Sequence, residues 1–213
     1  MTNVWNDRAA LYVESDAHRE GEDLETIVEW AAGAATALDV ATGGGHVARR
    51  LREAGLTVIT SDAAPGMHPD VVCPAESLPF ADASFDVVAC RTAAHHFGDV
   101  RAAVAEMARV TRRTLIVVDT ISMGDDVEEA EKLRDPSHVR NYTEAEWRSL
   151  VADTGLAIED VRLYEHTFDL QAWLARTGCE GAEAERAVEL LGDRAADGRI
   201  TLAKIAIRAE RGV

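Results

Sequence analysis

Short apolar runs alternate along the chain with segments in which apolar residues recur every three or four positions. Runs such as "FDVVAC" and "TLIVVDT" place several aliphatic residues side by side, as in strands that are covered on both faces. The segments between them have the spacing of amphipathic helices. The pattern predicts strands over residues 36–41, 57–62, 70–73, 85–90, 114–120, 156–164 and 199–208, and helices over 7–15, 21–33, 45–54, 99–110, 125–134, 143–154, 169–177 and 181–191.

This alternation predicts an α/β fold in which helices cover both faces of a mostly parallel sheet. With 213 residues, of which 47% are hydrophobic, the chain is long enough for one domain with a sizeable core. Ligands of such folds bind at the carboxyl ends of the strands, near the point where the strand order reverses. A site is therefore expected in the loops that follow the strands.

Three consecutive glycines, Gly43, Gly44 and Gly45, lie between the first predicted strand and a predicted helix. Glycine suits a tight turn or a close approach of the backbone to a ligand. The helix that begins there offers free N–H donors and the positive end of its dipole. The loop is therefore expected to hold an anionic or strongly polar group of a ligand.

Composition narrows the choice of ligand and compartment. A net charge of −16 and a pI near 4.8 disfavour binding to nucleic acid, so a small molecule is the expected partner. The three cysteines are widely spaced and form no Cys-x-x-Cys pair, which indicates neither a zinc site nor a disulfide framework. No apolar run is long enough to span a membrane. We expect a cytoplasmic monomer or homodimer without a metal ion and without membrane insertion.

Two cofactors fit the glycine loop. The segment from Gly43 to Ala48 matches G-x-G-x-x-A, and Asp62 follows Gly43 by 19 residues, close to the position of the acidic ribose ligand in dinucleotide enzymes. Asp39 disfavours a nicotinamide enzyme, because dinucleotide folds usually carry an aliphatic residue inside the first strand. A buried acid at that position needs a cationic or N–H partner. Neither lysine has a tyrosine four residues before it, so no Tyr-x-x-x-Lys pair is present.

The order of several motifs adds a resemblance to a known family. The pattern Asp-x-Ala-x-Gly-x-Gly from Asp39 to Gly45 is followed by "ITSDAAPGM", "AESLPFADASFDVVACRTAAHHF" and "AEMARV". Together these segments resemble the class I methyltransferases that depend on S-adenosylmethionine (SAM). More narrowly, the chain is similar to the type 11 group, which is related to the C-methyltransferases of ubiquinone and menaquinone biosynthesis. The resemblance covers most of the chain and is strongest over residues 37–120.

The resemblance implies a Rossmann-like fold with a mostly parallel seven-stranded sheet, helices on both faces and a small helical cap. It implies a single methyltransferase domain over residues 1–213, with a SAM-binding core at 36–120 and cap segments at 1–33 and about 121–145. The SAM-binding residues it implies are Asp39, Ala41, Thr42, Gly43, Gly45, His46, Asp62, Ala63, Ala75, Glu76 and Arg91.

Two of these positions have clear physical roles. Asp62 can accept hydrogen bonds from the ribose hydroxyls, and Ala63 is small enough to lie against adenine. Ala41 replaces the commonest first glycine of the motif, and we expect it to need no positive φ.

One family contact to adenine is missing. The family commonly has an aspartate at the position of Pro74, which holds the adenine amino group. Glu76 or a backbone carbonyl near Ala75 is expected to substitute, or adenine is held by packing alone.

The residues from Arg91 to Phe97 face the transferable methyl group in the resembled enzymes. His96 is the expected general base, with His95 as the second choice, because an unperturbed histidine can accept a proton near neutral pH. The alternative for each is a histidine at a helix end that is hydrogen-bonded to the backbone.

Substrate contacts are expected from the two cap segments. Tyr12, His18, His138 and Arg140 are the candidates, with a surface location as the alternative for the two histidines and the arginine, and core or lid packing for Tyr12.

The expected function is SAM-dependent methyl transfer to carbon or oxygen of a small molecule, such as a quinone-like, phenolic or secondary-metabolite acceptor. Two alternatives remain open from the residues alone. One is an NAD(P)-binding oxidoreductase, and the other is a SAM-binding accessory protein without turnover.

Overall fold

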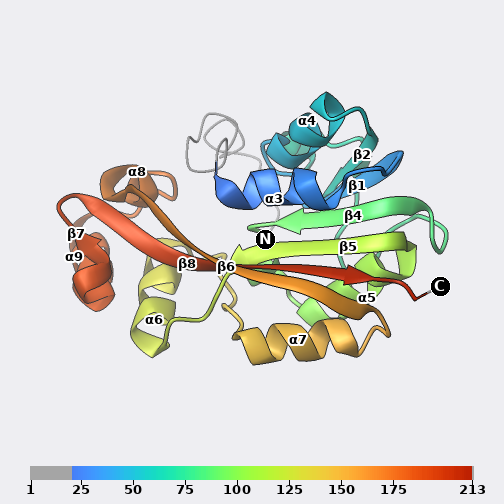
Figure 1. Ribbon diagram of the computed structural model, residues 1–213. Coiled ribbons are helices and arrows are strands. Elements are labelled where there is room, and N and C mark those ends of the chain that lie inside the picture. The colour runs from blue at the N-terminus through green and yellow to red at the C-terminus, as the bar shows by residue number, and fades with distance from the viewer. Residues whose placement is uncertain (1–20, 213) are drawn as a thin grey trace.

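One mixed sheet runs through the molecule (Figure 1), in a computed structural model that describes residues 21–212. Seven strands follow the order β3-β2-β1-β4-β5-β8-β6, and the short β7 pairs with β8. The strands are β1 (Thr36–Val40), β2 (Thr57–Asp62), β3 (Val71–Val72), β4 (Phe85–Arg91), β5 (Thr111–Thr120), β6 (Ala157–Asp169), β7 (Ala195–Ala196) and β8 (Arg199–Glu210). β1 to β5 pair in parallel, whereas β8 is antiparallel to both β5 and β6. The predicted seven-stranded, mostly parallel sheet is confirmed.

The helices follow the predicted segments closely. They are α3 (Glu22–Trp30), α4 (His46–Glu53), α5 (Val100–Val110), α6 (Asp125–Arg134), α7 (Glu144–Ala152), α8 (Leu170–Ala175) and α9 (Gly181–Leu191), with short 3-10 helices η1 (Pro65–Met67), η2 (Ala94–His96) and η3 (Gly192–Arg194). Local signals set some of these ends. α7 begins with a capping box, in which Thr143 and Glu146 bond each other's backbone N–H groups. The helix predicted over 7–15 lies outside the described residues.

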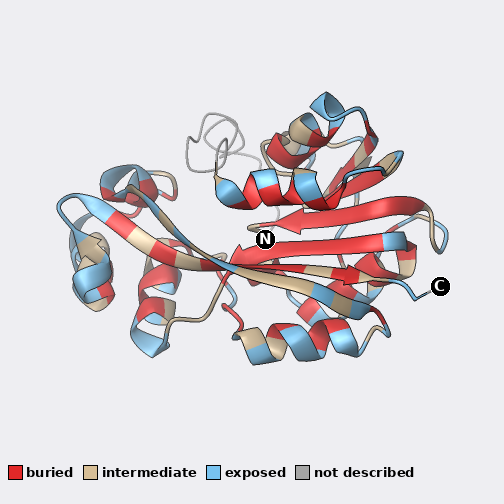
Figure 2. Cartoon of the chain, viewed as in Figure 1, coloured by how far each residue is buried: buried red, intermediate tan, exposed pale blue. Residues whose placement is uncertain are grey.

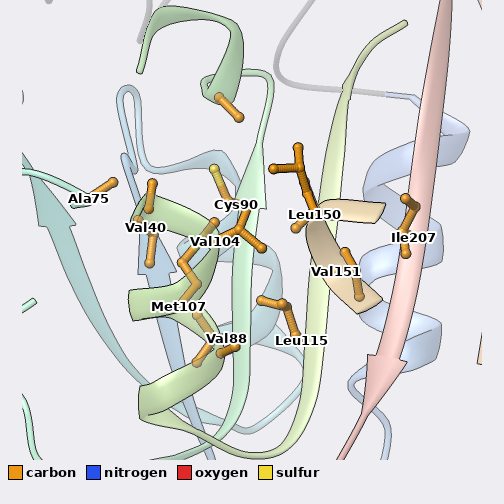
Figure 3. Packing of buried hydrophobic residues seen from close by; sticks show 14 of the residues in the cluster. Val40, Ala75, Val88, Cys90, Val104, Met107, Leu115, Leu150, Val151 and Ile207 are labelled. Carbon is orange, nitrogen blue, oxygen red and sulfur yellow. The ribbon is translucent and has the colours of Figure 1, made fainter. Parts of the chain in front are cut away.

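Helices cover both faces of the sheet, and the central strands β4 and β5 are buried along most of their length (Figure 2). On one face α3 and α4 pack Leu24, Ile27 and Leu51 against the sheet. On the other face α5 and α7 contribute a second apolar cluster, part of which Figure 3 shows. It includes Val104 and Met107 of α5 and Leu150 and Val151 of α7, packed with Val88, Leu115 and Ile207 of the sheet.

A third apolar cluster lies beyond the sheet, at the left of Figure 1, where β6 and β8 continue past the end of β5. We call this part the helical lobe: α6, α8 and α9 with residues 165–169 of β6 and 199–203 of β8. Its core includes Val127, Ala130, Leu170, Trp173, Leu174, Ala187, Leu191, Ile200 and Leu202.

The lobe explains why β6 is five residues longer at its end than predicted. β6 was expected to stop at residue 164, but its pairing with β8 continues from Glu165 opposite Ala203 to Asp169 opposite Arg199. Within residues 21–212 no helix combines the length and the apolar character needed to cross a membrane.

Candidate active site

A cavity of about 330 Å³ lies at the carboxyl ends of β1, β2 and β4. We call it the cofactor cavity. It is lined by Asp39, Ala41, Thr42, Gly43, Gly44, His46, Val47, Asp62, Ala63, Ala64, Met67, Cys73, Pro74, Ala75, Glu76, Arg91, Thr92, Ala93, His96, Phe97 and Gly98. Of the predicted cofactor residues only Gly45 is not in this lining. It is the N-cap of α4 and has a φ of 73°, a left-handed conformation that glycine adopts at low cost.

Asp39 is buried at the end of β1, where it ties the strand to the start of α4. Its Oδ2 accepts hydrogen bonds from the Thr42 hydroxyl at 2.6 Å and from the Ala48 N–H at 3.0 Å. The predicted N–H partner for this acid is therefore confirmed. Burial raises the pKa of Asp39 to about 6, although both hydrogen bonds favour the ionised form.

Asp62 ends β2 and lies on the opposite side of the glycine loop. Its Oδ2 accepts from the Gly43 N–H at 3.0 Å, and its Oδ1 accepts from the Ala64 N–H at 2.9 Å. Burial raises the pKa of this carboxyl. Because each oxygen of an ionised carboxylate can accept a further hydrogen bond, Asp62 can also receive the two hydroxyls of a ribose. The donor set of the cavity therefore fits an adenosyl cofactor.

Ala41 corrects one expectation from the sequence. Its φ of 54° lies in the left-handed region, so the prediction that this position needs no positive φ is wrong. The chain must turn sharply there, because Thr42 donates its N–H to Ser61 O at 3.0 Å and its hydroxyl to Asp39. Thr92, directly after β4, has a similar φ of 55°. Both residues line the cofactor cavity, in keeping with the tendency of strained backbone to collect at functional sites.

Arg91, a predicted cofactor residue, lines the cavity while its guanidinium group pairs with Asp23 of α3. Lys204 of β8 donates to the same carboxylate from Nζ at 3.1 Å and lies 3.3 Å from the Thr92 hydroxyl. Burial alone would raise the pKa of Asp23, but Lys204 and Arg91 together hold it far below its usual range. This buried triad joins the helix before the sheet to two of its strands.

His95 and Asp119 form a buried pair where β5 ends. His95 Nδ1 lies 2.5 Å from Asp119 Oδ1, and Asp119 Oδ2 accepts from the His95 backbone N–H at 2.8 Å. Burial by itself would lower the pKa of His95, but the charge of Asp119 outweighs it and raises the pKa. Asp119 thereby fixes the ring orientation and makes the imidazole more basic.

His96 differs from its neighbour. Its Nδ1 donates to Ser137 O at 3.1 Å, which is the backbone hydrogen bond weighed as the alternative to catalysis. Burial and the positive charge of His95, whose ring centroid is 4.1 Å away, lower the pKa of His96 to about 3. His96 therefore lines the cofactor cavity as a neutral ring.

The two predicted substrate residues that the structure describes, His138 and Arg140, lie away from this cavity. Tyr12 and His18 lie outside the described residues. His138 is buried with Nε2 3.1 Å from Glu128, and Arg140 pairs with Glu146 on the surface. Neither His138 nor Arg140 lines the cofactor cavity.

Asp23, Asp119 and Lys204 are site residues that the sequence analysis missed. A signal for Lys204 was present, because a lysine inside the apolar run "ITLAKIAI" needs a buried partner for the same reason as Asp39. The partner itself carried no signal, since Asp23 is 181 residues away and lies in an ordinary acidic helix start.

The sheet order, the turn at the carboxyl end of β1 and the two acids that flank it define a class I SAM-dependent methyltransferase. Residues 38–117 match the model of a methyltransferase domain. The chain belongs to this family, since it is also 32% identical over 228 aligned positions to the uncharacterized methyltransferase YcgJ of Bacillus subtilis. That alignment covers 94% of this chain and 90% of YcgJ.

Solved structures agree with this assignment. The crystal structure of YcgJ has a TM-score of 0.79 at 27% identity, covering 90% of this chain and 98% of that one. A Bacillus halodurans protein provisionally assigned as a methyltransferase has a TM-score of 0.78 at 27% identity, covering 91% and 100%. The geranyl diphosphate C-methyltransferase of Streptomyces coelicolor, solved with S-adenosylhomocysteine (SAH), shares the fold with a TM-score of 0.63 at 15% identity, covering 89% of this chain and 75% of that one.

The cofactor of this chain is therefore SAM. Both alternatives left open by the residues, the NAD(P)-binding oxidoreductase and the accessory protein without turnover, give way to this family.

Proposed function

We propose that this methyltransferase acts on a small molecule whose acceptor oxygen or carbon must lose a proton before it attacks, and that His95 takes that proton. The observation that carries the proposal is the buried His95–Asp119 pair, next to a cavity built for SAM. The protein carries a net charge of −16, which favours a small acceptor over nucleic acid. A cytoplasmic monomer or homodimer, with all three cysteines free, completes the proposal.

The residues of this chain divide the work between binding and proton transfer. The glycine loop and Asp62 hold the nucleoside part of the cofactor, and Asp39 fixes the loop through Thr42 and the start of α4. Bound SAM supplies a methyl group on a positively charged sulfur, which leaves as a neutral thioether when the acceptor's electron pair attacks the methyl carbon.

His95 is the better base of the two adjacent histidines, which reverses the order expected from sequence. A general base works best when its pKa lies near the operating pH, and the pKa of His96 is depressed to about 3. Asp119 occupies Nδ1 of His95, which leaves Nε2 as the nitrogen that accepts the proton. Asp119 is a positioning residue, since it acts through His95.

The test is a single-turnover assay on His95→Asn, whose amide can keep the hydrogen bond to Asp119 but cannot accept a proton. The acceptor is first found by screening quinols, phenols and small metabolites for SAH formation with the wild-type protein. We expect the variant to lose roughly 10² to 10⁴ in the rate of methyl transfer, with SAH affinity within about threefold of wild type.

Two variants control for indirect effects. His68→Asn changes an exposed histidine outside the cofactor cavity and should leave the rate unchanged. His96→Ala tests the rival base, and a large loss there together with full activity in His95→Asn would overturn the proposal.

The pH profile separates Asp119 from a purely structural role. His95 acts in its neutral form, so the rate should rise with pH and level off above its pKa. Removing the charge in Asp119→Asn lowers that pKa, so the rising limb should move to lower pH. An unchanged limb in a folded variant would argue against the pair.

A further inference from the structure

A second cavity, of about 60 Å³, adjoins the cofactor cavity, and the function proposed above does not account for its lining. Thr92 and His96 line both cavities, so the two are neighbours at the end of β4. We call the smaller one the lobe cavity, because α6, α8 and the extended part of β6 and β8 contribute to its wall. Its volume is about twice that of one water molecule in the liquid, so it suits water and is too small for a methyl acceptor.

The lobe cavity brings a carboxylate close to the proposed base. His95 and Glu131 of α6 both line it. The exposed fractions of their side chains are 11% and 7%, so both are almost fully enclosed by protein. Charges that are separated by so small a space and screened so little by solvent interact strongly.

The carboxylate of Glu131 is buried without a permanent cation beside it. Asn141 Nδ2 donates a hydrogen bond to Glu131 Oε2. In the part of the chain that the structure describes, no lysine or arginine lies within ion-pair distance of this carboxylate. A buried carboxylate with one neutral donor is costly unless a positive charge compensates it. The neighbouring histidines are the groups that can supply such a charge.

Of the histidines near Glu131, His95 is the one whose surroundings favour the charged form. His138 Nε2 lies 3.9 Å from Glu131 Oε2, but the same nitrogen is 3.1 Å from Glu128 Oε1, and burial lowers the pKa of His138. His166 also lines the cavity, and burial together with nearby cations lowers its pKa to about 4. His95 is therefore the counter-charge that suits Glu131.

Charged groups surround His95 on several elements. Asp119 of β5 and Glu131 favour its protonated form, whereas burial and Arg134 of α6 favour the neutral one. The other titratable groups in the cavity wall or beside the ring are His96, His138, His166, Arg176 and Lys204. The two carboxylates thus act on the imidazole together, Asp119 through the hydrogen bond at Nδ1 and Glu131 across the lobe cavity.

We propose that Glu131 is a second positioning residue of the methyl transfer, and that its carboxylate balances the positive charge that His95 acquires when it takes the acceptor's proton. The inference rests on the function proposed above and deepens it. The proton leaves the O–H or C–H bond of the acceptor and forms an N–H bond at Nε2 of His95, while the electron pair left on the acceptor attacks the methyl carbon. Glu131 bonds neither the acceptor nor SAM and acts through His95.

The experiment follows the titration of His95 by NMR in the full chain saturated with SAH. The histidine rings are isotope-labelled, and the His95 signal is the one missing from His95→Asn. Glu131→Gln keeps an oxygen that can accept from Asn141 but removes the charge. We expect it to lower the titration midpoint of His95 by about one pH unit, because losing a nearby negative charge disfavours the protonated ring.

Two further variants assign the effect to the charge at this position. Glu131→Met removes the charge and the hydrogen-bond acceptor, and it should lower the midpoint by a similar amount. Glu129→Gln removes a charge from an exposed position of the same helix, outside the lobe cavity, and should leave the midpoint unchanged. Thermal melting shows whether each variant is folded. An unchanged midpoint in either folded Glu131 variant, or an equal change in Glu129→Gln, would overturn the inference.

A second readout keeps this inference separate from the function on which it rests. In Glu131→Gln the rising limb of the pH–rate profile for methyl transfer should move to lower pH together with the NMR midpoint. Glu131→Asp restores the charge and should bring both back toward wild type. A limb that stays in place while the midpoint moves would remove His95 as the base, and with it the proposed function. A midpoint that stays in place would remove the role of Glu131 and leave methyl transfer standing.

Discussion

Arg91 donates hydrogen bonds to both carboxylate oxygens of Asp23, with its Nε 2.8 Å from Oδ2 and a terminal nitrogen 3.0 Å from Oδ1. Lys204 adds a third donor to the same acid. All three side chains are buried, so water cannot solvate their charges. The negative charge of Asp23 is instead balanced by the positive charges of Arg91 and Lys204. The arrangement fixes α3 against the end of β4 and the middle of β8, beside the cofactor cavity.

Replacing Asp23 should therefore destabilise the protein strongly. Asp23→Asn leaves two buried cations without their counter-charge, and we expect it to lower the free energy of unfolding by about 3–5 kcal/mol. Urea denaturation monitored by circular dichroism measures this change. Glu29→Gln on the same helix is the control, because its pair with Arg162 is exposed to solvent and should contribute little to stability. Similar losses in the two variants would contradict the prediction.

The pKa of Asp39 predicts a pH-dependent contribution to stability. Its folded value of about 6 exceeds the ordinary 3.8, so the protonated carboxyl favours the folded state. This contribution is fully present below about pH 4 and is lost as the pH rises through about 6, a change of about 3 kcal/mol. Asp39→Asn stays neutral at all pH values and should lack this dependence.

The measurement is urea denaturation of wild type and Asp39→Asn at intervals from pH 4 to pH 7, without cofactor. Wild-type stability should fall relative to the variant across that window. Parallel stability curves would show that Asp39 titrates at its ordinary value in the folded protein.

Replacing Ala41 by glycine should stabilise the folded protein. The left-handed conformation costs a residue with a Cβ roughly 1–2 kcal/mol, while glycine loses about 0.5–1 kcal/mol more conformational entropy on folding. Ala41→Gly should therefore stabilise the protein by about 0.5–1 kcal/mol. Ala37→Gly, in β1 just before this turn, replaces a buried alanine without a positive φ and should destabilise the protein. Thermal melting of both variants tests the opposite signs, and a loss of stability in Ala41→Gly would count against this account.

Asp62 should control cofactor affinity. SAH at 100 times its dissociation constant stabilises the folded protein by roughly 2.7 kcal/mol, and Asp62→Ala should remove most of the resulting shift in melting temperature. Asp82→Ala changes an exposed acid on a remote loop and should keep the shift. Stabilisation by NADH, with none by SAH or SAM, would overturn the cofactor assignment.

Much of the fold was predictable because each element carries its own pattern. The buried strands are continuous apolar runs, and the glycine loop marks the turn into α4 at the sequence level. The cofactor cavity followed from the same rule, since the carboxyl ends of parallel strands meet at one edge. Ala41 was misjudged because its backbone angle depends on hydrogen bonds that Thr42 makes to residues of two strands.

The cavity of about 60 Å³ beside the helical lobe could not be predicted from the sequence for a related reason. Arg134, His166, Arg176 and Lys204 come from α6, β6, the end of α8 and β8, and none belongs to a motif. Their proximity depends on the extension of β6 and β8 past β5. The sequence pattern near residue 165 did not distinguish this extension of β6 from a loop. The order of His95 and His96 as bases likewise depends on Asp119, which lies 24 residues further along the chain.

The length of the paired extension of β6 and β8 also determines where the lobe lies relative to the rest of the sheet. Strand residues advance by roughly 3.3 Å each, so two residues added to both strands would carry the lobe outward by roughly 7 Å and keep every side chain on its original face. A single added residue would instead exchange the faces and turn His166 away. The length of this two-stranded extension thus sets how far the lobe lies from the cofactor cavity, and it can be lengthened in even steps while the cofactor half of the protein stays as it is.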